Sequence, residues 1–342
     1  MKLAVVLFNL GGPGAPEEIE PFLRNLFSDP AIIALPGFFR NPLARFIASR
    51  RAPVAREIYA QIGGRSPILE ETEAQARALE ESLAARGHDA RAFVAMRYAK
   101  PFSADVAHAV TAWGPDRTVL LPLYPQFSTT TTASSLEAWR AAIGSEIVAA
   151  SHRVCCYPWE EGFVAAAAEL IQAQWVRRRP GVDYRLLLSA HGLPKRTVAK
   201  GDPYPWQVEK TAQAIVDRLG IEGLDWTVCY QSRVGPLEWI GPATDAEISR
   251  AGAEKRGLVV APIAFVSEHS ETLVELDIEY AKLSQLAGVP DYLRVATVST
   301  HPGFIGGLAG LVEKALTVSP ATCGSGRICP AGIARCGFGE RA

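Results

Sequence analysis

The sequence has few of the features that mark secreted, nucleic-acid-binding or membrane-spanning proteins. Six of its 342 residues are cysteine, too few for a disulfide framework, and the formal net charge is -1. No run of lysine and arginine stands out, which argues against nucleic acid as the main partner. No apolar stretch approaches the roughly 20 residues of a membrane-spanning helix. The short apolar start, 3–10, lacks the length and cleavage site of a signal peptide, so we expect a cytoplasmic protein.

What the sequence does have is an alternation of β-branched or leucine-rich runs with longer amphipathic stretches. The clearest helical pattern is 68–86, and another begins at Thr244, which we expect to form a capping box with Glu247. The apolar runs predict strands at 3–9, 89–96, 117–123, 146–155, 184–189, 225–230, 257–263 and 293–297. Strands that alternate with helices indicate parallel sheets covered on both faces. We therefore predict an α/β protein with two doubly wound domains, 1–156 and 157–318, and a cysteine-rich tail, 319–342.

A histidine follows directly after the predicted strand 184–189. His191 lies in the segment SAHGLP, and ligands of open parallel sheets bind where strands end and loops begin. An imidazole there could take protons near neutral pH or bind a metal ion. The alternative is a histidine that satisfies backbone groups in a turn, and this segment alone does not decide between them.

An acidic pattern follows the predicted strand 257–263. Glu268, Glu271 and Glu275 are spaced three and four apart, so a helix starting near Ser267 would carry them on one face. If this face lines a crevice, it forms a path for protons or a divalent cation. The alternative is a solvated acidic face, whose first carboxylates simply complement the helix dipole.

Three other segments suggest ligand contacts. The hydroxyl run Ser128 to Thr132 could bind an anion or cap a helix. Trp239, between two Gly-Pro turns, would suit a flat apolar ligand. Residues 32–47 are strongly apolar but interrupted by Pro36, Gly37 and Pro42, and they are either a buried connection or an exposed apolar lip.

Together, eight segments in this order resemble ferrochelatase over about residues 3–317. They read LFNLGGP, RRAPVAREIYAQIGGRSPI, MRYAKP, PLYPQFSTTTTASS, SAHGLP, GDPYPWQ, YQSRVGPLEWIGPATD and PIAFVSEHSETLVELDIEY. The resemblance implies two Rossmann-like domains with the porphyrin in the cleft between them. It also implies insertion of ferrous iron into protoporphyrin IX, with release of two protons, as the last step of haem biosynthesis. Alternatives are a coproporphyrin ferrochelatase, a non-catalytic porphyrin or haem carrier, a chelatase for another tetrapyrrole, and a regulatory iron–sulfur protein.

The resemblance also implies roles for specific residues. His191 matches the active-site histidine and Glu271 the carboxylate facing it, so both are expected to be catalytic and to bind metal. The expected proton or metal path contains Glu268, His269 and Glu275. The expected porphyrin contacts are Leu10, Arg51, Tyr59, Ser66, Arg97, Tyr98, Tyr124, Phe265 and Trp239. Two positions depart from the family: Val54 stands where some members have a propionate-binding lysine, and Leu10 replaces a methionine.

The tail CGSGRICPAGIARC is expected to hold a [2Fe–2S] cluster. Many ferrochelatases carry such a cluster on a cysteine-rich extension, and here its ligands would be Cys323, Cys329 and Cys336. Thr129 occupies the position from which animal members draw the fourth ligand. We choose Cys156 instead, over Cys155 and Cys229, because neighbouring strand residues point to opposite faces. The alternative is a four-thiolate zinc site.

The remaining expectations concern partners. An apolar lip at 32–47 would handle the poorly soluble porphyrin or bring the protein to the inner face of the membrane, since Phe38, Phe39 and Phe46 lie beside Arg40 and Arg45. The oligomeric state stays open, with a homodimer as one candidate.

Overall fold

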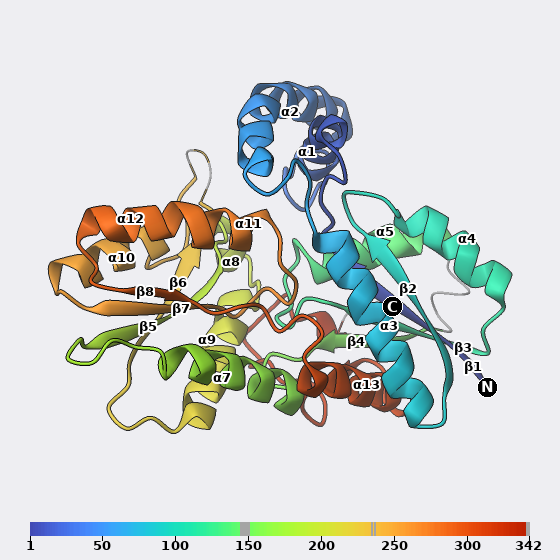
Figure 1. The fold of residues 1–342 in the computed structure, drawn as a ribbon. Coiled ribbons are helices and arrows are strands. Elements are labelled where there is room, and N and C mark those ends of the chain that lie inside the picture. Colours follow the sequence, from blue (N-terminus) through green and yellow to red (C-terminus); the bar gives the residue numbers. More distant parts are fainter. Residues whose placement is uncertain (144–150, 234, 236, 340–342) are drawn as a thin grey trace. The chain divides into compact units, whose positions relative to one another are not determined.

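The computed structural model describes residues 1–143, 151–233, 235 and 237–339, which form two compact units. The first unit comprises Met1–Tyr157, Leu308–Ile328 and Gly337–Ala342, and the second comprises Pro158–Gly307 and Cys329–Cys336. Each contains one parallel sheet, which confirms the predicted fold class (Figure 1). The segment 308–328, which we expected in the second domain and the tail, belongs to the first unit because its strand pairs there.

The sheet of the first unit has the strand order β2-β1-β3-β4-β9. Its parallel strands are β1 (Lys2–Asn9), β2 (Asp89–Met96), β3 (Arg117–Pro122), β4 (His152–Cys156) and β9 (Ala321–Thr322). Its helices are α1 (Ile19–Phe27), α2 (Gly37–Ala60), α3 (Ile68–Ala85), α4 (Ser103–Trp113) and α5 (Thr132–Ile143), and α13 (Pro302–Thr317) leads back into this unit. Short 3-10 turns lie at Pro16–Glu18 and Gly337–Gly339.

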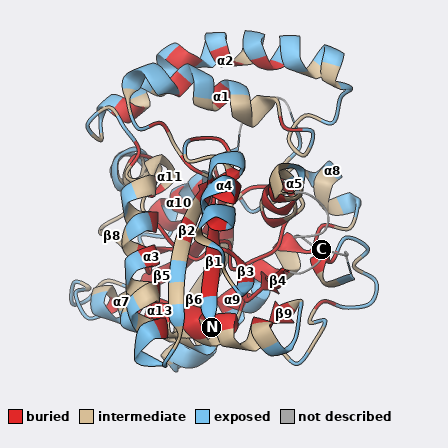
Figure 2. Cartoon of the chain, turned by 90° about the vertical axis from the view of Figure 1, so that its right-hand side faces the viewer, coloured by how far each residue is buried: buried red, intermediate tan, exposed pale blue. Residues whose placement is uncertain are grey.

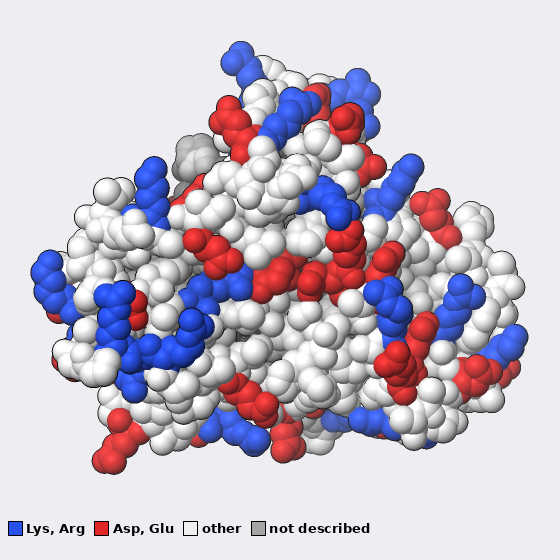
Figure 3. Space-filling model, viewed as in Figure 1, with Lys and Arg blue, Asp and Glu red and all other residues white. Residues whose placement is uncertain are grey.

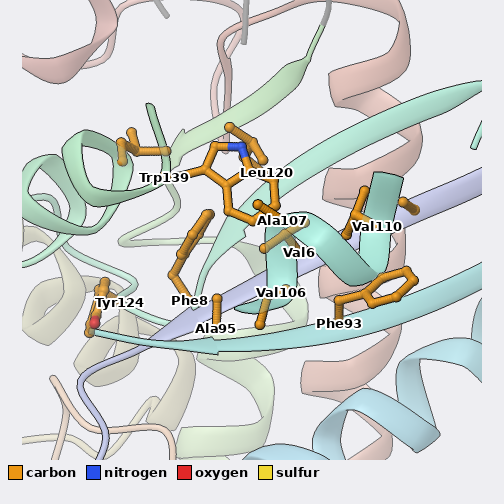
Figure 4. Packing of buried hydrophobic residues seen from close by; sticks show 12 residues of the cluster. Val6, Phe8, Phe93, Ala95, Val106, Ala107, Val110, Leu120, Tyr124 and Trp139 are labelled. Carbon is orange, nitrogen blue, oxygen red and sulfur yellow. The ribbon is translucent and has the colours of Figure 1, made fainter. Parts of the chain in front are cut away.

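The core of the first unit lies on both faces of β1. Ala4, Val6 and Phe8 point to one face, where they pack with residues of α4 and α5, and Phe8 meets the ring of Trp139 edge-on at 5.8 Å (Figure 4). Residues 3, 5 and 7 point to the other face and are buried as well. This burial explains why β1 is a continuous apolar run rather than an alternating one.

The second unit has the strand order β6-β5-β7-β8. Its parallel strands are β5 (Tyr184–His191), β6 (Asp225–Gln231), β7 (Gly257–Pro262) and β8 (Tyr292–Arg294). Its helices are α7 (Glu161–Trp175), α8 (Lys195–Ala199), α9 (Tyr204–Leu219), α10 (Thr244–Ala253), α11 (Ser270–Leu273) and α12 (Tyr280–Ala287), with a π-helical turn at Glu275–Glu279. The central strand β5 is buried up to Ala190, so its last residue emerges at the edge of the sheet.

Some local details differ from the sequence-based expectations. The strand expected at 146–155 corresponds to β4, which begins at His152, and positions 146–150 lie outside the described residues. The capping box at Thr244 is wrong: Ala243 is the N-cap, and the Thr244 hydroxyl lies 3.3 Å from Ser189 Oγ in the core. The two-residue strand β9 was not predicted, because such a short strand has no recognisable period.

The apolar stretch 32–47 enters a continuous helix, and not a broken segment, since α2 runs through both Pro42 and Pro53. Its alanines at 44, 48 and 52 are buried, and Ala48 and Ala52 pack in a cluster that includes Ile19 of α1. Phe38, Phe39 and Phe46 are 71%, 60% and 58% exposed, and much of α2 is pale blue in Figure 2. The stretch is therefore exposed rather than a buried connection, and its contact with a ligand or a membrane stays a prediction.

No helix within the described ranges is long and apolar enough to span a bilayer. On the face drawn in Figure 3, basic and acidic side chains both occur, in small groups of one sign.

Candidate active site

His191 is the last residue of β5, the central strand of its sheet. Its backbone register partner is Gln231, the last residue of β6, and Gly192 N donates to Gln231 O at 2.9 Å. A Cβ at position 192 would lie 3.0 Å from that carbonyl and 3.2 Å from the ring of Trp239. The glycine of SAHGLP therefore allows the chain to turn tightly behind the histidine, whose side chain is 37% exposed.

Glu271 faces this histidine from α11. His191 Nδ1 and Glu271 Oε2 are 2.9 Å apart, and the same oxygen lies 3.8 Å from Nε2 of His269, the N-cap of α11. His269 Nδ1 lies 3.1 Å from the carbonyl of Ser267, to which it can donate. The structure thus brings together both residues that the sequence suggested as catalytic, with His269 beside them.

Glu275 follows at the start of the π-helical turn and is surrounded by donors. Its carboxylate accepts from Ser232 N at 2.8 Å, from Ser232 Oγ, from Tyr280 OH at 2.9 Å and from Gln231 Nε2 at 3.0 Å. Gln231 is held in this orientation because Ser189 Oγ donates to its amide oxygen at 2.8 Å. The amide also donates to the backbone oxygen of Glu271, so it links the two carboxylate residues.

Glu268 does not lie on the same helix face, and that expectation is wrong. The helix begins at Ser270, not near Ser267, and the π-helical turn changes the spacing after Val274. Glu268 instead makes a two-pronged ion pair with Arg294 and accepts from Thr297 N at 2.9 Å. Burial raises the pKa of Glu268, but the bonds and charge of Arg294 outweigh it and leave the pKa below its usual value. Its place in a proton or metal path stays a prediction.

His191 and Glu271 shift each other's pKa values through their charges. Burial lowers the pKa of His191, but the charge of Glu271, the hydrogen bond to it and the charge of Glu275 raise it above its ordinary value. Burial likewise raises the pKa of Glu271, yet His191 and His269 hold it well below its usual range. Burial and the nearby charge of Glu271 raise the pKa of Glu275. The arrangement is an ionised carboxylate against an easily protonated imidazole, with a second carboxylate that takes up a proton more readily than the first.

Aromatic rings border the histidines. The ring of Phe265 meets His191 edge-on at 6.5 Å and lies 4.8 Å from the ring of His269. Trp239 is bridged through its backbone to Pro194, just after SAHGLP, and its Nε1 is buried without a hydrogen-bond partner in the part of the chain that the structure describes. Both predicted ring contacts thus lie near the segment that carries His191.

The other predicted porphyrin contacts lie in the first unit, where the residues after three adjacent strands approach one edge of the sheet. Leu10 follows β1, Arg97 follows β2 and Tyr124 follows β3. Ser66, Tyr59 and Tyr98 are buried, and Arg51 is exposed on α2. Tyr98 is 0% exposed and its hydroxyl donates to Asp29, while the guanidinium of Arg97 stacks over its ring at 4.9 Å, so Tyr98 itself is not available for a ligand contact.

Several residues of the site were missed from the sequence. Gln231 is the last residue of β6 and Ser232 follows it, so their place at a strand end could have identified them. Asp29 and Arg294 gave no signal, because their contacts join segments far apart in the chain. Tyr280 was missed although it follows Glu275 by only five positions. Within the described ranges, no three His, Cys, Asp or Glu side chains are grouped as a metal site.

The model of the family described as ferrochelatase matches residues 2–316, nearly the whole chain. The chain belongs to the ferrochelatase family. A ferrochelatase of Phenylobacterium zucineum is 55% identical over 338 residues, covering 98% of each chain. A ferrochelatase of Caulobacter vibrioides is 52% identical, covering 98% of this chain and 97% of its own. The family resemblance of the eight segments is thereby confirmed.

Solved structures agree with the family's fold. SirB from Bacillus subtilis, determined with Fe3+, covers 92% of this chain and 96% of its own with a TM-score of 0.53 at 13% identity. The sirohydrochlorin chelatase SirB from Bacillus subtilis subspecies spizizenii, in complex with cobalt, gives a TM-score of 0.54 at 12% identity, covering 92% of this chain and 95% of its own. At 12% and 13% identity, this likeness shows only that the chain has the same fold as these two proteins.

Proposed function

We propose that this chain inserts ferrous iron into protoporphyrin IX to form protohaem. The observation that carries the proposal is the contact between His191 and Glu271 at the end of a central strand, with Glu275 next in line. Two inner N–H protons of the porphyrin must leave as one Fe2+ enters, so the reaction needs both a base and an oxygen or nitrogen ligand for the ion. A site with only these few ligands suits an ion that is handed on to the porphyrin rather than one that stays.

The roles follow from the charges. Neutral His191 can take a pyrrole proton, because its raised pKa makes the imidazolium that results more stable. Glu271 stays ionised and can attract Fe2+ or stabilise that imidazolium. Glu275, whose pKa is raised, can receive a proton next, through the hydrogen-bonded groups around it. In the first unit, Arg97 offers a cation for a porphyrin carboxylate.

An insertion assay tests the proposal directly. Purified protein should convert protoporphyrin IX and Fe2+ to haem with turnover, followed by the loss of porphyrin fluorescence under anaerobic conditions. Coproporphyrin III, Zn2+ and Co2+ are the comparison substrates. Stoichiometric binding of porphyrin without metal insertion would instead identify a carrier, and a clear preference for coproporphyrin would change the substrate.

We also propose that the tail carries a [2Fe–2S] cluster held by Cys323, Cys329, Cys336 and Cys156. These four cysteines would supply soft thiolates, which suit such a cluster. The register partner of Cys156 is Thr322, the residue before Cys323, which supports Cys156 as a ligand. Gln207 Nε2 donates to Cys329 Sγ at 3.2 Å, a bond that would stabilise a thiolate. Cys229 is a poor candidate, because burial raises its pKa to about 12.

Protein purified without oxygen should therefore be coloured, with absorption that dithionite bleaches and about two irons and two sulfides per chain. Cys156→Ser should lose the colour, whereas the matched control Cys229→Ser should keep it. A coloured Cys156→Ser protein would transfer the fourth position to Cys155. Stoichiometric zinc without sulfide would contradict the cluster.

Finally, we propose that the lip of α2 touches a membrane surface. Phe38 and Phe39 are adjacent and mostly exposed, with ring centroids 4.1 Å apart, and Phe46 packs under the guanidinium of Arg50. Apolar rings flanked by arginines are typical of helices that lie in the interface of anionic bilayers.

The protein should co-sediment with vesicles that contain anionic lipid, and Phe38→Ser/Phe39→Ser should weaken this partitioning by about 10²-fold or more, since each of the two buried rings contributes about 2 kcal/mol. Leu286→Ser is a matched control, because Leu286 is 78% exposed on α12, far along the chain from the lip. Absence of binding by the unaltered protein would limit the lip to contacts with the porphyrin.

A further inference from the structure

Asp29 is a buried carboxylate that neither the sequence nor the reaction accounts for. It follows α1 and is 3% exposed, although an isolated charge in such a place would be strongly destabilising. One of its oxygens, Oδ1, accepts from Ala31 N at 2.7 Å. The other, Oδ2, accepts from Arg97 Nη2 at 2.6 Å, from Tyr98 OH at 2.8 Å and from Ser134 Oγ.

These bonds fix one guanidinium in a defined orientation. Arg97 Nε donates to Ser134 Oγ at 2.7 Å, and that hydroxyl donates onward to Asp29. The planar group is thus held at Nε and Nη2, while Nη1 has no hydrogen-bond partner among the described residues and is not buried. The side chain of Arg97 is 21% exposed, compared with 2% for that of Asp29.

The held guanidinium lies where a ligand is expected. Arg97 follows β2, and its backbone N donates to Asn9 O at the end of β1, so it stands at the carboxyl edge of the sheet. A carboxylate that approaches this edge would meet Nη1 of a guanidinium whose orientation is already fixed by its bonds at Nε and Nη2. Such preorganisation lowers the entropic cost of binding without adding a contact.

We propose that Asp29 is a positioning residue that aims Arg97 at a carboxylate of the porphyrin substrate. The proposal rests on the proposed function, since it assigns the anionic end of that same substrate. It also explains why Asp29 must be a carboxylate: asparagine has one acceptor oxygen, and both oxygens of Asp29 are used. An amide nitrogen at the Oδ2 position would face Arg97 Nη2 donor to donor, and the guanidinium would move.

The test compares Asp29→Asn with the unaltered protein on two porphyrins. With the dicarboxylic porphyrin, we expect KM to rise by about tenfold or more while kcat changes little, because one charge-assisted bond that orients Arg97 is lost. With the dimethyl ester of the same porphyrin, dispersed in detergent, the two proteins should have the same KM. Asp116→Asn is the control for removing a carboxylate elsewhere, since the Asp116 side chain accepts only from Lys2 N among the described residues, and it should leave both values unchanged.

Ser134→Ala provides a second test that keeps the buried charge pair and removes the acceptor of Arg97 Nε. It should raise KM for the diacid in the same direction but by less, which keeps the proposal testable if Asp29→Asn does not fold. Equal losses with diacid and ester would show a merely structural role and overturn the proposal. Tighter binding of the diacid would overturn it as well, because Asp29 would then only neutralise Arg97. Failure of the unaltered protein to insert metal would count against the proposed function instead.

Discussion

His191→Ala is expected to lose metal insertion almost completely, by about 10³-fold or more in kcat, while the protein still folds and binds porphyrin. The side chain is at the end of β5 and is partly exposed, so its removal leaves no large cavity in the core. A general base contributes about 10²- to 10⁴-fold by itself, and the loss of a metal contact would add to this. The measurement is the initial rate of haem formation, together with porphyrin affinity from fluorescence.

His108→Ala is the matched control, because His108 is exposed on α4. It should retain the unaltered rate. If His191→Ala turns over normally, the proton must be taken by another group, and the assignment of the base is wrong.

Glu271→Gln should lower kcat by about 10²-fold or more with little effect on porphyrin binding, because the amide keeps the shape but not the charge. The pH profile should shift too. Glu271 holds the pKa of His191 above its ordinary value, so in the unaltered protein the rate rises with pH as the imidazolium loses its proton. Without that charge, burial dominates and the pKa of His191 falls, which moves the acidic limb of kcat/KM to lower pH.

Glu222→Gln serves as the control, since Glu222 is exposed in the loop before β6. It should change neither the rate nor the profile. An acidic limb that moves to higher pH in Glu271→Gln would mean that the limb belongs to a group other than His191, and equal losses in binding and turnover would indicate a structural role for Glu271.

The fold could be predicted largely because its strands are buried on both faces. β1, β5 and β7 each contain a run of buried apolar residues, and a run of that kind followed by an amphipathic stretch is typical of parallel α/β units. His191 could be predicted for the same reason, since a polar residue that directly ends such a run lies at the ligand-binding edge. The pairing of Glu271 with it came from the family resemblance, and the 2.9 Å contact between the two side chains agrees with it.

What could not be predicted depends on contacts between distant segments. Asp29 and Arg97 are separated by 68 positions, and nothing local to Asp29 indicates a buried partner. The spacing of Glu268, Glu271 and Glu275 suggested one regular helix, but the π-helical turn and the ion pair of Glu268 with Arg294 divide them among separate environments. A one-residue change in helical period leaves no trace in a hydrophobicity pattern.

Because β4 pairs with β9, the sheet of the first unit can be completed only late in synthesis. A chain that emerges from the ribosome begins folding from its N-terminus, but the first unit lacks its last strand until residues 321–322 have been synthesised. Throughout the synthesis of the second unit, β4 is an edge with unpaired backbone groups, the kind of edge that invites pairing with other chains. The first unit is therefore not a module that can be cut out at residue 157. Its completion waits until residues 321–322 have been translated, and a nascent chain stalled in the second unit leaves the edge of β4 unpaired.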